Sequence, residues 1–356
     1  MGKRPDSVQA QRGRGATANP PSRHAAQHAE ACDDGWYEEP LPPLRTQVAT
    51  DSSRSVISWN DSPDIPFDRS VNPYRGCEHG CVYCYARPGH AWLGLSPGLD
   101  FETRLFAKDD AAALLRGELG ARTYRCGPIA LGAVTDAYQP VERMRGITRA
   151  VLELLAELRH PVTIVTKSAL IERDIDLLAD LARDRLAHVQ VSVTTLRADL
   201  ARRLEPRAAS PQRRLDTVTR LRAAGIPVGV LVAPVIPVLT DSELEAVLAA
   251  ASDAGALSAG YVLLRLPLEV AGLFRDWLEA YVPGQAAHVM ARVQDTRGGR
   301  DNDARFGRRM VGTGLYADLI AQRFVLAARR LGYLELPPLR TDLFRKPVRS
   351  GQLSLF

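Results

Sequence analysis

The chain has 356 residues, 46% of them hydrophobic and 24% charged, so it is long enough to bury one large core or two small ones. No apolar run approaches the roughly 20 residues that span a bilayer, and no apolar stretch follows the basic N-terminus. The formal net charge of +5 permits a nucleic-acid partner without requiring one. We therefore expect a cytoplasmic protein with no membrane partner and no secretory signal.

The chain begins with a segment, residues 1–50, that is rich in Pro, Gly, Ala, Arg and Gln and has no hydrophobic period. This composition predicts disorder, with Cys32 as a free thiol. Short apolar runs then alternate with helical patterns over residues 55–285. The predicted strands are 70–75, 129–134, 162–166, 188–193, 228–235 and 261–266, and the predicted helices are 141–158, 171–183, 211–224, 241–254 and 270–281.

This alternation predicts an α/β fold, because repeated β-then-α units form parallel strands joined by right-handed crossovers. Six units make three-quarters of a (β/α)8 TIM-type barrel, so we expect a partial (β/α)6 barrel with its chemistry at the carboxyl ends of the strands. Residues 286–336 are predicted to form a C-terminal helical extension. Residues 337–356 are irregular and basic, and we expect a flexible tail there.

Three cysteines follow the first predicted barrel strand, with the spacing C-x3-C-x2-C at Cys77, Cys81 and Cys84. Gly76 and Gly80 allow the loop to turn tightly, so that three thiolates can face one centre. Thiolates are the usual ligands of iron–sulfur clusters. Three of them on a four-iron cube leave one iron open, and an open coordination site indicates chemistry.

Other interpretations of the cysteines stay open. They can be small buried apolar residues, or they can bind structural zinc with His79 or His90 as fourth ligand, although no second pair of ligands follows at finger spacing. Recruitment of Cys126 would complete four ligands and make an electron-transfer cluster. The open-iron interpretation accounts best for a tight loop punctuated by glycines.

With Tyr83 before the last cysteine, this loop resembles that of the radical S-adenosylmethionine (SAM) superfamily. Further motifs resemble the DNA-repair-photolyase-like members related to spore photoproduct lyase, over about residues 55–335. They begin at Asn72 (NPYRGC), Cys84 (CYAR), Thr135 (TDAYQP), Thr166 (TKS), Leu204 (LEPR) and Gly229 (GVLVAPVIP).

The resemblance implies a radical SAM enzyme. Cys77, Cys81 and Cys84 would hold a [4Fe-4S] cluster whose open iron binds the amino and carboxylate groups of SAM. Reductive cleavage of SAM would then give methionine and a 5′-deoxyadenosyl radical, with the electron supplied by a donor such as flavodoxin or ferredoxin. Thr135, Asp136, Lys167, Ser192 and Thr194 are the expected cofactor-binding residues. Tyr85 matches a cofactor-contacting tyrosine, and we predict a catalytic role for it.

One departure concerns the hydrogen-donating cysteine that the lyase places close to its Thr-Asp pair. Here that stretch reads Gly-Ala-Val-Thr-Asp over residues 132–136, and Cys126 lies before the strand, at its far end. We therefore do not predict reversal of a DNA photoproduct by that route.

Two features suggest a nucleic-acid setting. The chain ends in Gln352, Leu353, Ser354, Leu355 and Phe356, which is similar to the peptide that docks bacterial polymerases on the DNA sliding clamp. Arginines also cluster in two places, in loops that can track phosphates. The first cluster is Arg202, Arg203, Arg207, Arg213 and Arg214, and the second is Arg297, Arg300, Arg305, Arg308 and Arg309.

The leading hypothesis is thus a radical SAM enzyme that modifies or repairs nucleic acid. Radical SAM modification of a peptide or a small metabolite is the second hypothesis. The third is a binding protein that associates with the sliding clamp and whose cluster is structural.

Overall fold

The computed structural model describes residues 13–24 and 44–347. Its centre is a seven-stranded sheet with the order β10-β9-β8-β7-β6-β3-β2, in which β2 alone is antiparallel to its neighbour. The strands are β2 (Ile57–Trp59), β3 (Arg69–Val71), β6 (Ile129–Leu131), β7 (Val162–Thr166), β8 (Ala187–Ser192), β9 (Val228–Val235) and β10 (Ser258–Leu263). The six parallel strands confirm the predicted α/β partial barrel.

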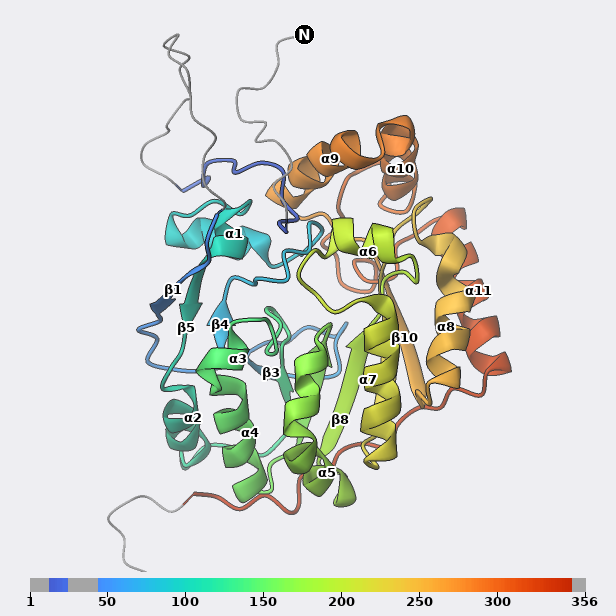
Figure 1. Cartoon of the computed structure of the whole chain (residues 1–356). Helices are drawn as coiled ribbons and strands as arrows, with labels where there is room; N and C mark the ends of the chain where they lie inside the picture. The colour runs from blue at the N-terminus through green and yellow to red at the C-terminus, as the bar shows by residue number, and fades with distance from the viewer. Residues whose placement is uncertain (1–12, 25–43, 348–356) are drawn as a thin grey trace, which may run out of the picture.

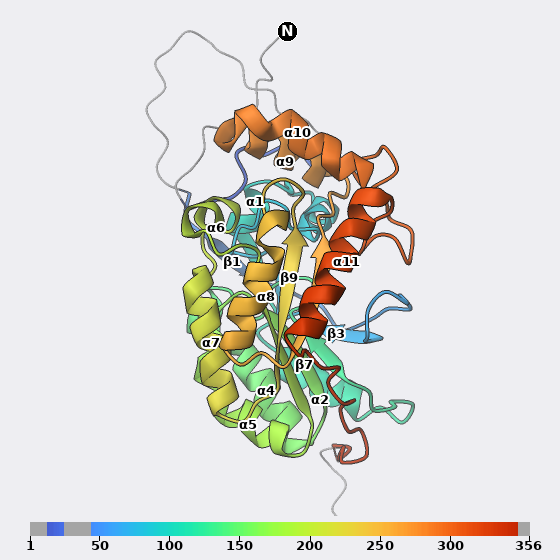
Figure 2. The ribbon, with the colours of Figure 1, turned by 90° about the vertical axis from the view of Figure 1, so that its right-hand side faces the viewer.

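Helices cover the outside of the sheet, except that α9 (Glu269–Tyr281) and α10 (Pro283–Asp295) lie across one end of it (Figure 1). The other helices are α2 (Ala111–Leu119), α3 (Glu142–Arg145), α4 (Ile147–Glu157), α5 (Ile175–Arg183), α6 (Ala198–Leu204), α7 (Pro211–Ala223), α8 (Leu244–Asp253) and α11 (Leu315–Arg330). The arrow of β9 in Figure 2 points toward α9 and α10, so the carboxyl ends of the strands lie at that end. We call this end the mouth of the barrel.

Two predicted elements are divided in the structure. The predicted strand 70–75 is split into β3 and β4 (Tyr74–Arg75), because Pro73 has no N–H to donate to a ladder. The short strand β4 joins β5 (Arg104–Ala107) and β1 (Gln47–Thr50) in a separate sheet. The predicted helix 141–158 is interrupted at Gly146, whose φ of 67° ends α3.

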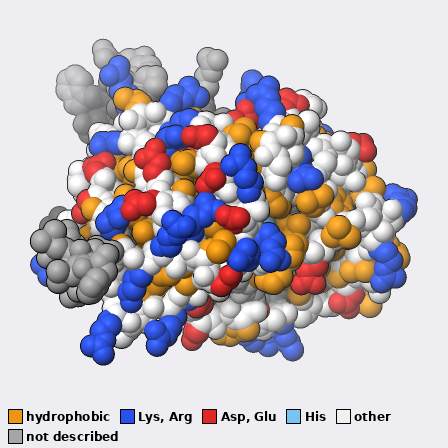
Figure 3. Space-filling view, turned by 90° about the horizontal axis from the view of Figure 1, so that it is seen from below, with side chains coloured by type: hydrophobic (Ala, Val, Ile, Leu, Met, Phe, Trp, Pro, Cys, Tyr) orange, Lys and Arg blue, Asp and Glu red, His pale blue; other side chains and the backbone are white. Residues whose placement is uncertain are grey.

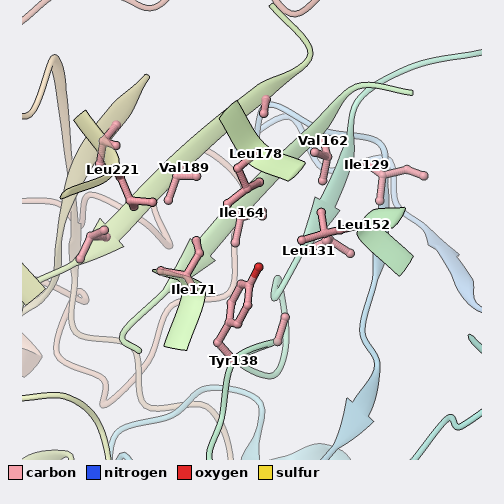
Figure 4. Packing of buried hydrophobic residues seen from close by; sticks show 14 of the residues in the cluster. Ile129, Leu131, Tyr138, Leu152, Val162, Ile164, Ile171, Leu178, Val189 and Leu221 are labelled. Atoms are coloured by element: carbon pink, nitrogen blue, oxygen red, sulfur yellow. The ribbon is translucent and has the colours of Figure 1, made fainter. Parts of the chain in front are cut away.

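The core lies between the sheet and its helices. Ile129, Leu131, Val162, Ile164 and Val189 project from neighbouring strands, and each is at most 1% exposed. Figure 4 shows these side chains packed against residues of the surrounding helices and against Tyr138. The buried positions of β7 and β8 are apolar or β-branched for the most part, and they alternate with partly exposed positions such as Thr163 and Gln190.

The predicted disorder of residues 1–50 is wrong for two parts of that segment. Residues 14–18 are buried, with Ala16 fully so, because two of their backbone N–H groups donate to a buried carboxylate beside the cysteines. Residues 47–50 form β1. Cys32 lies outside the described residues.

The predicted flexible tail, 337–356, is likewise ordered as far as Pro347. Phe344 packs edge-on against the ring of His160 at 5.1 Å, at the end of the barrel where the strands begin. The N–H groups of Arg340 and Arg345 donate to the carbonyls of Arg185 and Leu158. Figure 3, seen from this end, shows basic and acidic side chains interspersed. The clamp-like residues 352–356 lie outside the described part of the chain, so clamp docking stays a prediction.

Within residues 13–24 and 44–347, no helix is long and apolar enough to cross a membrane.

Candidate active site at the mouth of the barrel

The cysteine loop follows β4 at the mouth. Gly76 and Gly80 have φ of 77° and 66°, which confirms the tight turns expected of them. Burial raises the pKa of the Cys77 thiol, and the charges of Asp136, Cys81 and Cys84 raise it further. The three sulfurs therefore lie within electrostatic reach of one another, as ligands of one cluster must.

Arg87 binds the backbone of this loop from its buried side. Its side chain is fully buried, and its Nε donates to the carbonyl of Cys81 at 2.9 Å. Its Nη2 donates to the carbonyl of Gly80 at 3.3 Å and to Glu102 Oε1 at 2.5 Å. Arg87 belongs to the CYAR motif, but the sequence offers no sign of this role.

Lys167 lies at the carboxyl end of β7. Its Nζ donates to Ser192 Oγ at 2.9 Å. Burial raises the pKa of the Cys81 and Cys84 thiols, and the positive charge of Lys167 lowers the pKa of both by less. An ammonium group has three donors, and within the described residues only Ser192 accepts from this one, so two can bind an anion at this edge of the sheet. Ser192 and Thr194 are both 1% exposed and both donate to the carbonyl of Ala233, so they share one side of the sheet as expected.

A buried polar network, which sequence reasoning missed, supports the cysteine loop. Glu205 is 2% exposed and accepts hydrogen bonds from Thr194 at 2.6 Å and from Tyr83 and Arg214. Burial alone would raise the pKa of Glu205, but the charges of Arg214 and Lys167 outweigh it and lower the pKa to about 2. Glu205 thus pairs directly with Arg214 and supports the side of the site on which Lys167 lies.

Thr135 and Asp136 lie in the loop after β6, where they bind other parts of the chain. Thr135 Oγ1 donates to the carbonyl of Tyr74 at 2.8 Å. Asp136 Oδ2 accepts from the Lys167 N–H at 2.8 Å and lies 3.3 Å from His79 Nδ1, while Oδ1 accepts from Thr166 Oγ1 at 2.8 Å. Asp136 thus positions Lys167, and direct contact of Thr135 and Asp136 with a cofactor stays a prediction.

Arginines surround Tyr85 on the open side of the mouth. Tyr85 is 44% exposed, its hydroxyl donates to the carbonyl of Ala133, and the guanidinium of Arg265 lies 5.1 Å from its ring centroid. Arg297 is 1% exposed and donates to four backbone carbonyls, two of them those of Leu263 and Leu264. Burial, and then the charge of Arg265, lower the pKa of Arg297 to about 10. The Nε atoms of both arginines are buried without a hydrogen-bond partner in the described part of the chain.

A contact across the open side joins the two edges of the sheet. Arg309 Nε lies 2.5 Å from Asp64 Oδ2, and the Gly307 N–H donates to Asp64 Oδ1 at 2.7 Å. Asp64 belongs to the loop between β2 and β3, whereas the N–H of Leu263 in β10 donates to the carbonyl of Met310. We call this contact the seam.

A model of the radical SAM superfamily matches residues 71–251, which contain the cysteine loop and the strand ends just described. The chain belongs to the radical SAM superfamily. Membership of this superfamily implies a [4Fe-4S] cluster and SAM as cofactors.

Proteins similar to this radical SAM chain occur in bacteria and in a phage. An uncharacterized protein of Mycobacterium tuberculosis is 40% identical over 216 residues, which are 60% of this chain and 64% of that protein. The chain therefore matches just under two thirds of the length of this relative. The radical SAM Nalpha-GlyT isomerase of Pseudomonas phage M6 is 27% identical over 169 residues, which are 47% of this chain and 33% of the isomerase.

Among solved structures, spore photoproduct lyase complexed with dinucleoside spore photoproduct has a similar fold. The TM-score is 0.56 at 15% identity, and the match covers 80% of each chain. The structure of a lyase variant with bound SAM and the same photoproduct has a TM-score of 0.51 at 16% identity. The predicted relation to the spore photoproduct lyases is thus confirmed at the level of the fold.

The residues present fit the two cofactors of a radical SAM protein. Three thiols lie in one short loop whose backbone Arg87 binds, and none of them forms a disulfide among the described cysteines. The ammonium group of Lys167 suits a carboxylate such as that of SAM.

The histidines considered as zinc ligands are engaged elsewhere. His79 faces Asp136, and His90 Nε2 lies 2.9 Å from the carbonyl of Arg104. No group of three or more His, Cys, Asp and Glu side chains in residues 13–24 and 44–347 is placed to hold a single metal ion. Ligands of a [4Fe-4S] cube each bind a different iron, so they are spaced more widely than the ligands of one ion.

Cys126 lies before β6, beside Arg69 and Tyr124. Because Arg69 begins β3, this is the end of the barrel opposite the cysteine loop. Cys126 is therefore too remote to be a fourth ligand, as its position in the sequence suggested.

The first predicted arginine cluster is largely paired with carboxylates. Arg213 binds Glu172, Arg214 binds Glu205, and Arg207 lies 3.0 Å from Glu78. These three arginines have structural partners, so they do not form a free strip for phosphates. In the second cluster Arg300 and Arg308 are exposed, and Arg297 is the buried cation at the mouth.

Proposed function

We propose that this chain is a radical SAM enzyme that modifies or repairs nucleic acid. Cys77, Cys81 and Cys84 hold the [4Fe-4S] cluster, and Lys167 binds the carboxylate of SAM. Once bound, these cofactors would supply radical chemistry, in which one electron from a flavodoxin- or ferredoxin-type donor would cleave a C–S bond of SAM to give methionine, and a hydrogen atom would pass from the substrate to the 5′-deoxyadenosyl group.

The protein's own residues orient the cofactor and keep water away. Ser192 positions the ammonium group of Lys167, and Asp136 fixes the backbone of the same residue. Thr194 lies beside Ser192, where it can bind the ribose. Tyr85 borders both the cysteine loop and the arginines, and so we assign it to the contact between cofactor and substrate.

The observation that carries the assignment to nucleic acid is the positive charge at the mouth. Among the described residues, no carboxylate accepts a hydrogen bond from Arg265 or Arg297. The side chain of Arg309 donates to Asp64 and Ser62. The buried, unpartnered Nε of Arg265 lies next to Tyr85, at the point where a substrate must approach the cofactor. A buried donor without a partner is costly, so a ligand that accepts from it is favoured. Phosphate oxygens are such acceptors.

The main alternative is a peptide or a small anionic metabolite, since a carboxylate also pairs with arginine. The phage relative is named for an isomerase activity, so lesion repair is not the only activity named among the proteins similar to this chain. Nucleic acids differ from peptides and metabolites in size and in charge density, so salt dependence of binding separates the two substrate classes.

The test is binding of single- and double-stranded oligonucleotides by the reconstituted protein, at several salt concentrations. Replacing Arg265 with Ala is expected to weaken binding and to lower the slope of log K against log salt by about 0.7–0.9, the value for one phosphate contact. The matched control is Arg116→Ala, which also removes one positive charge. Arg116 lies on α2 and pairs with Glu157 of α4. Binding that is insensitive to salt, or equal effects of the two variants, would contradict the proposal and favour the alternative.

Lys167 gives a second prediction, for the cofactor. Lys167→Met keeps the length of the side chain but removes the charge, so the Kd for SAM is expected to rise about 10- to 100-fold, the worth of one charge-assisted hydrogen bond. Iron content should stay unchanged. Lys346→Met, at an exposed position near the opposite end, is the control. Equilibrium dialysis with labelled SAM measures both, and an unchanged Kd would remove Lys167 from the site.

A further inference from the structure

The segment of residues 14–18, which we call the N-terminal strap, lies against the cysteine loop, although it precedes Cys77 by about 60 residues. Three consecutive residues of the strap, Ala16, Thr17 and Ala18, are at most 6% exposed. Ala16 and Ala18 pack against Leu99 and against Leu273 of α9. In Figure 1 the blue segment that contains the strap crosses between α1 (Asp100–Thr103) and α9.

The strap binds the carboxylate of Glu102, which is fully buried in α1. The N–H of Gly15 donates to Glu102 Oε2 at 2.9 Å, and the N–H of Ala16 donates to Oε1 at 2.8 Å. Arg14 Nη1 donates to the backbone carbonyl of Glu102 at 2.9 Å. Hydrogen bonds to a buried carboxylate are stronger than those between neutral groups.

Glu102 connects the strap to the cysteine loop through Arg87. The same Oε1 accepts from Arg87 Nη2 at 2.5 Å, and Arg87 holds the carbonyls of Gly80 and Cys81. Strap, Glu102, Arg87 and loop therefore form one continuous chain of hydrogen bonds. Arg87 and Glu102 form a buried ion pair, and removal of the strap would leave the carboxylate with two of its donors missing.

Two glycines allow the strap to approach the loop this closely. A Cβ on Gly15 would lie 1.7 Å from the carbonyl oxygen of Gly80, and a Cβ on Gly98 would lie 2.2 Å from the carbonyl oxygen of Ala18. Both atoms belong to backbone, which cannot move aside cheaply. Either substitution by alanine must therefore displace the strap, from opposite sides of the contact.

We propose that the N-terminal strap is part of the cluster-binding unit. It holds the loop in the shape in which Cys77, Cys81 and Cys84 converge, and it keeps water and oxygen from the outer side of that loop. This inference rests on the proposed cluster, and the strap residues are positioning residues that act through Glu102 and Arg87.

The experiment compares Gly15→Ala and Gly98→Ala with Gly89→Ala, a control at an exposed position of the neighbouring 3-10 helix (Arg87–Leu93), where a Cβ meets nothing within 4 Å. In the apoprotein, hydrogen exchange of the amides of residues 77–87 is expected to speed up about tenfold in the two strap variants, the effect of losing a buried hydrogen bond. After anaerobic reconstitution, both should bind less iron and lose their cluster faster in air than the control. Far-UV circular dichroism checks that each variant is folded.

Two results would overturn the proposal. One is exchange of residues 77–87 in the strap variants at the rate of Gly89→Ala, and the other is equal iron content and equal lifetime in air. Failure of the proposed cluster itself looks different, because then the wild-type protein also binds no iron while the exchange difference in the apoprotein persists.

Discussion

Replacing any one of Cys77, Cys81 and Cys84 with alanine is expected to abolish the cluster and, with it, cleavage of SAM. In the proposed cluster each thiolate would bind a different iron of the cube, so loss of one would expose a second iron and leave the cluster held by two protein sulfurs. Cys77 is 7% exposed, and alanine fills most of its volume, so the fold should survive the change. Iron and sulfide content and the electron paramagnetic resonance spectrum of the reduced protein, with and without SAM, measure the outcome.

Cys126→Ala is the matched control, because it removes a partly buried thiol at the opposite end of the barrel. It should retain full iron content and a spectrum that changes when SAM is added. Zinc instead of iron in anaerobically prepared protein, or full iron in a Cys81→Ala variant, would refute the assignment.

The second large effect is expected at Glu205. Glu205→Gln keeps the shape of the side chain but leaves Arg214, which is 2% exposed, as a buried charge without a counter-ion. Such a change costs about 3–5 kcal/mol of unfolding free energy. Tyr83 and Thr194 lose a charged acceptor at the same time, so the loop residue before Cys84 also becomes less firmly held.

The pH dependence follows from the lowered pKa of Glu205. A carboxyl whose pKa is about 2 in the folded state, against its ordinary value of 4.5, contributes stability above pH 4.5, and this contribution is lost as the pH falls toward 2. The difference in unfolding free energy between the wild type and Glu205→Gln should therefore become smaller below pH 4.5. Urea unfolding at a series of pH values measures it.

The control is Glu157→Gln, because Glu157 pairs with Arg116 on the surface and both are about half exposed. Exposed ion pairs contribute about 0–1 kcal/mol, so this variant should unfold almost as the wild type does. If Glu205→Gln and Glu157→Gln lost equal amounts of unfolding free energy, the hydrogen bonds and ion pair of Glu205 would not stabilise the fold as inferred.

The parts of the fold that could be predicted from the sequence are those with a local pattern. Apolar and β-branched runs marked five of the six parallel strands within a few residues, because each strand buries at least one face in the core. The strand predicted at 129–134 ends at Leu131, since Gly132, with φ of 79°, turns the chain into the loop of Thr135 and Asp136. The cysteine spacing was informative because three thiols in eight residues have few other uses.

What could not be predicted depends on contacts between distant segments. Residues 14–18 have the composition of a disordered region, and only Glu102, 86 positions beyond Ala16, gives their N–H groups a buried acceptor. Glu205 stands in a charged stretch that reads as surface, and its burial depends on Arg214 and Tyr83. The arginines of the first cluster were predicted from charge alone, which cannot distinguish an arginine paired across the fold from a free one.

The seam has a consequence for how a polymer would reach the chemistry. Asp64 and Arg309 join the loop after β2 to the segment after β10, beside Arg265, so a nucleic-acid strand that entered between the sheet edges would have to break this ion pair. Under the proposed function, a nucleotide would more easily be flipped out of its stack and enter the barrel from the mouth, as enzymes that act on bases require. A frayed end, a loop or a damaged, weakly stacked position would then be a better target than an intact helix.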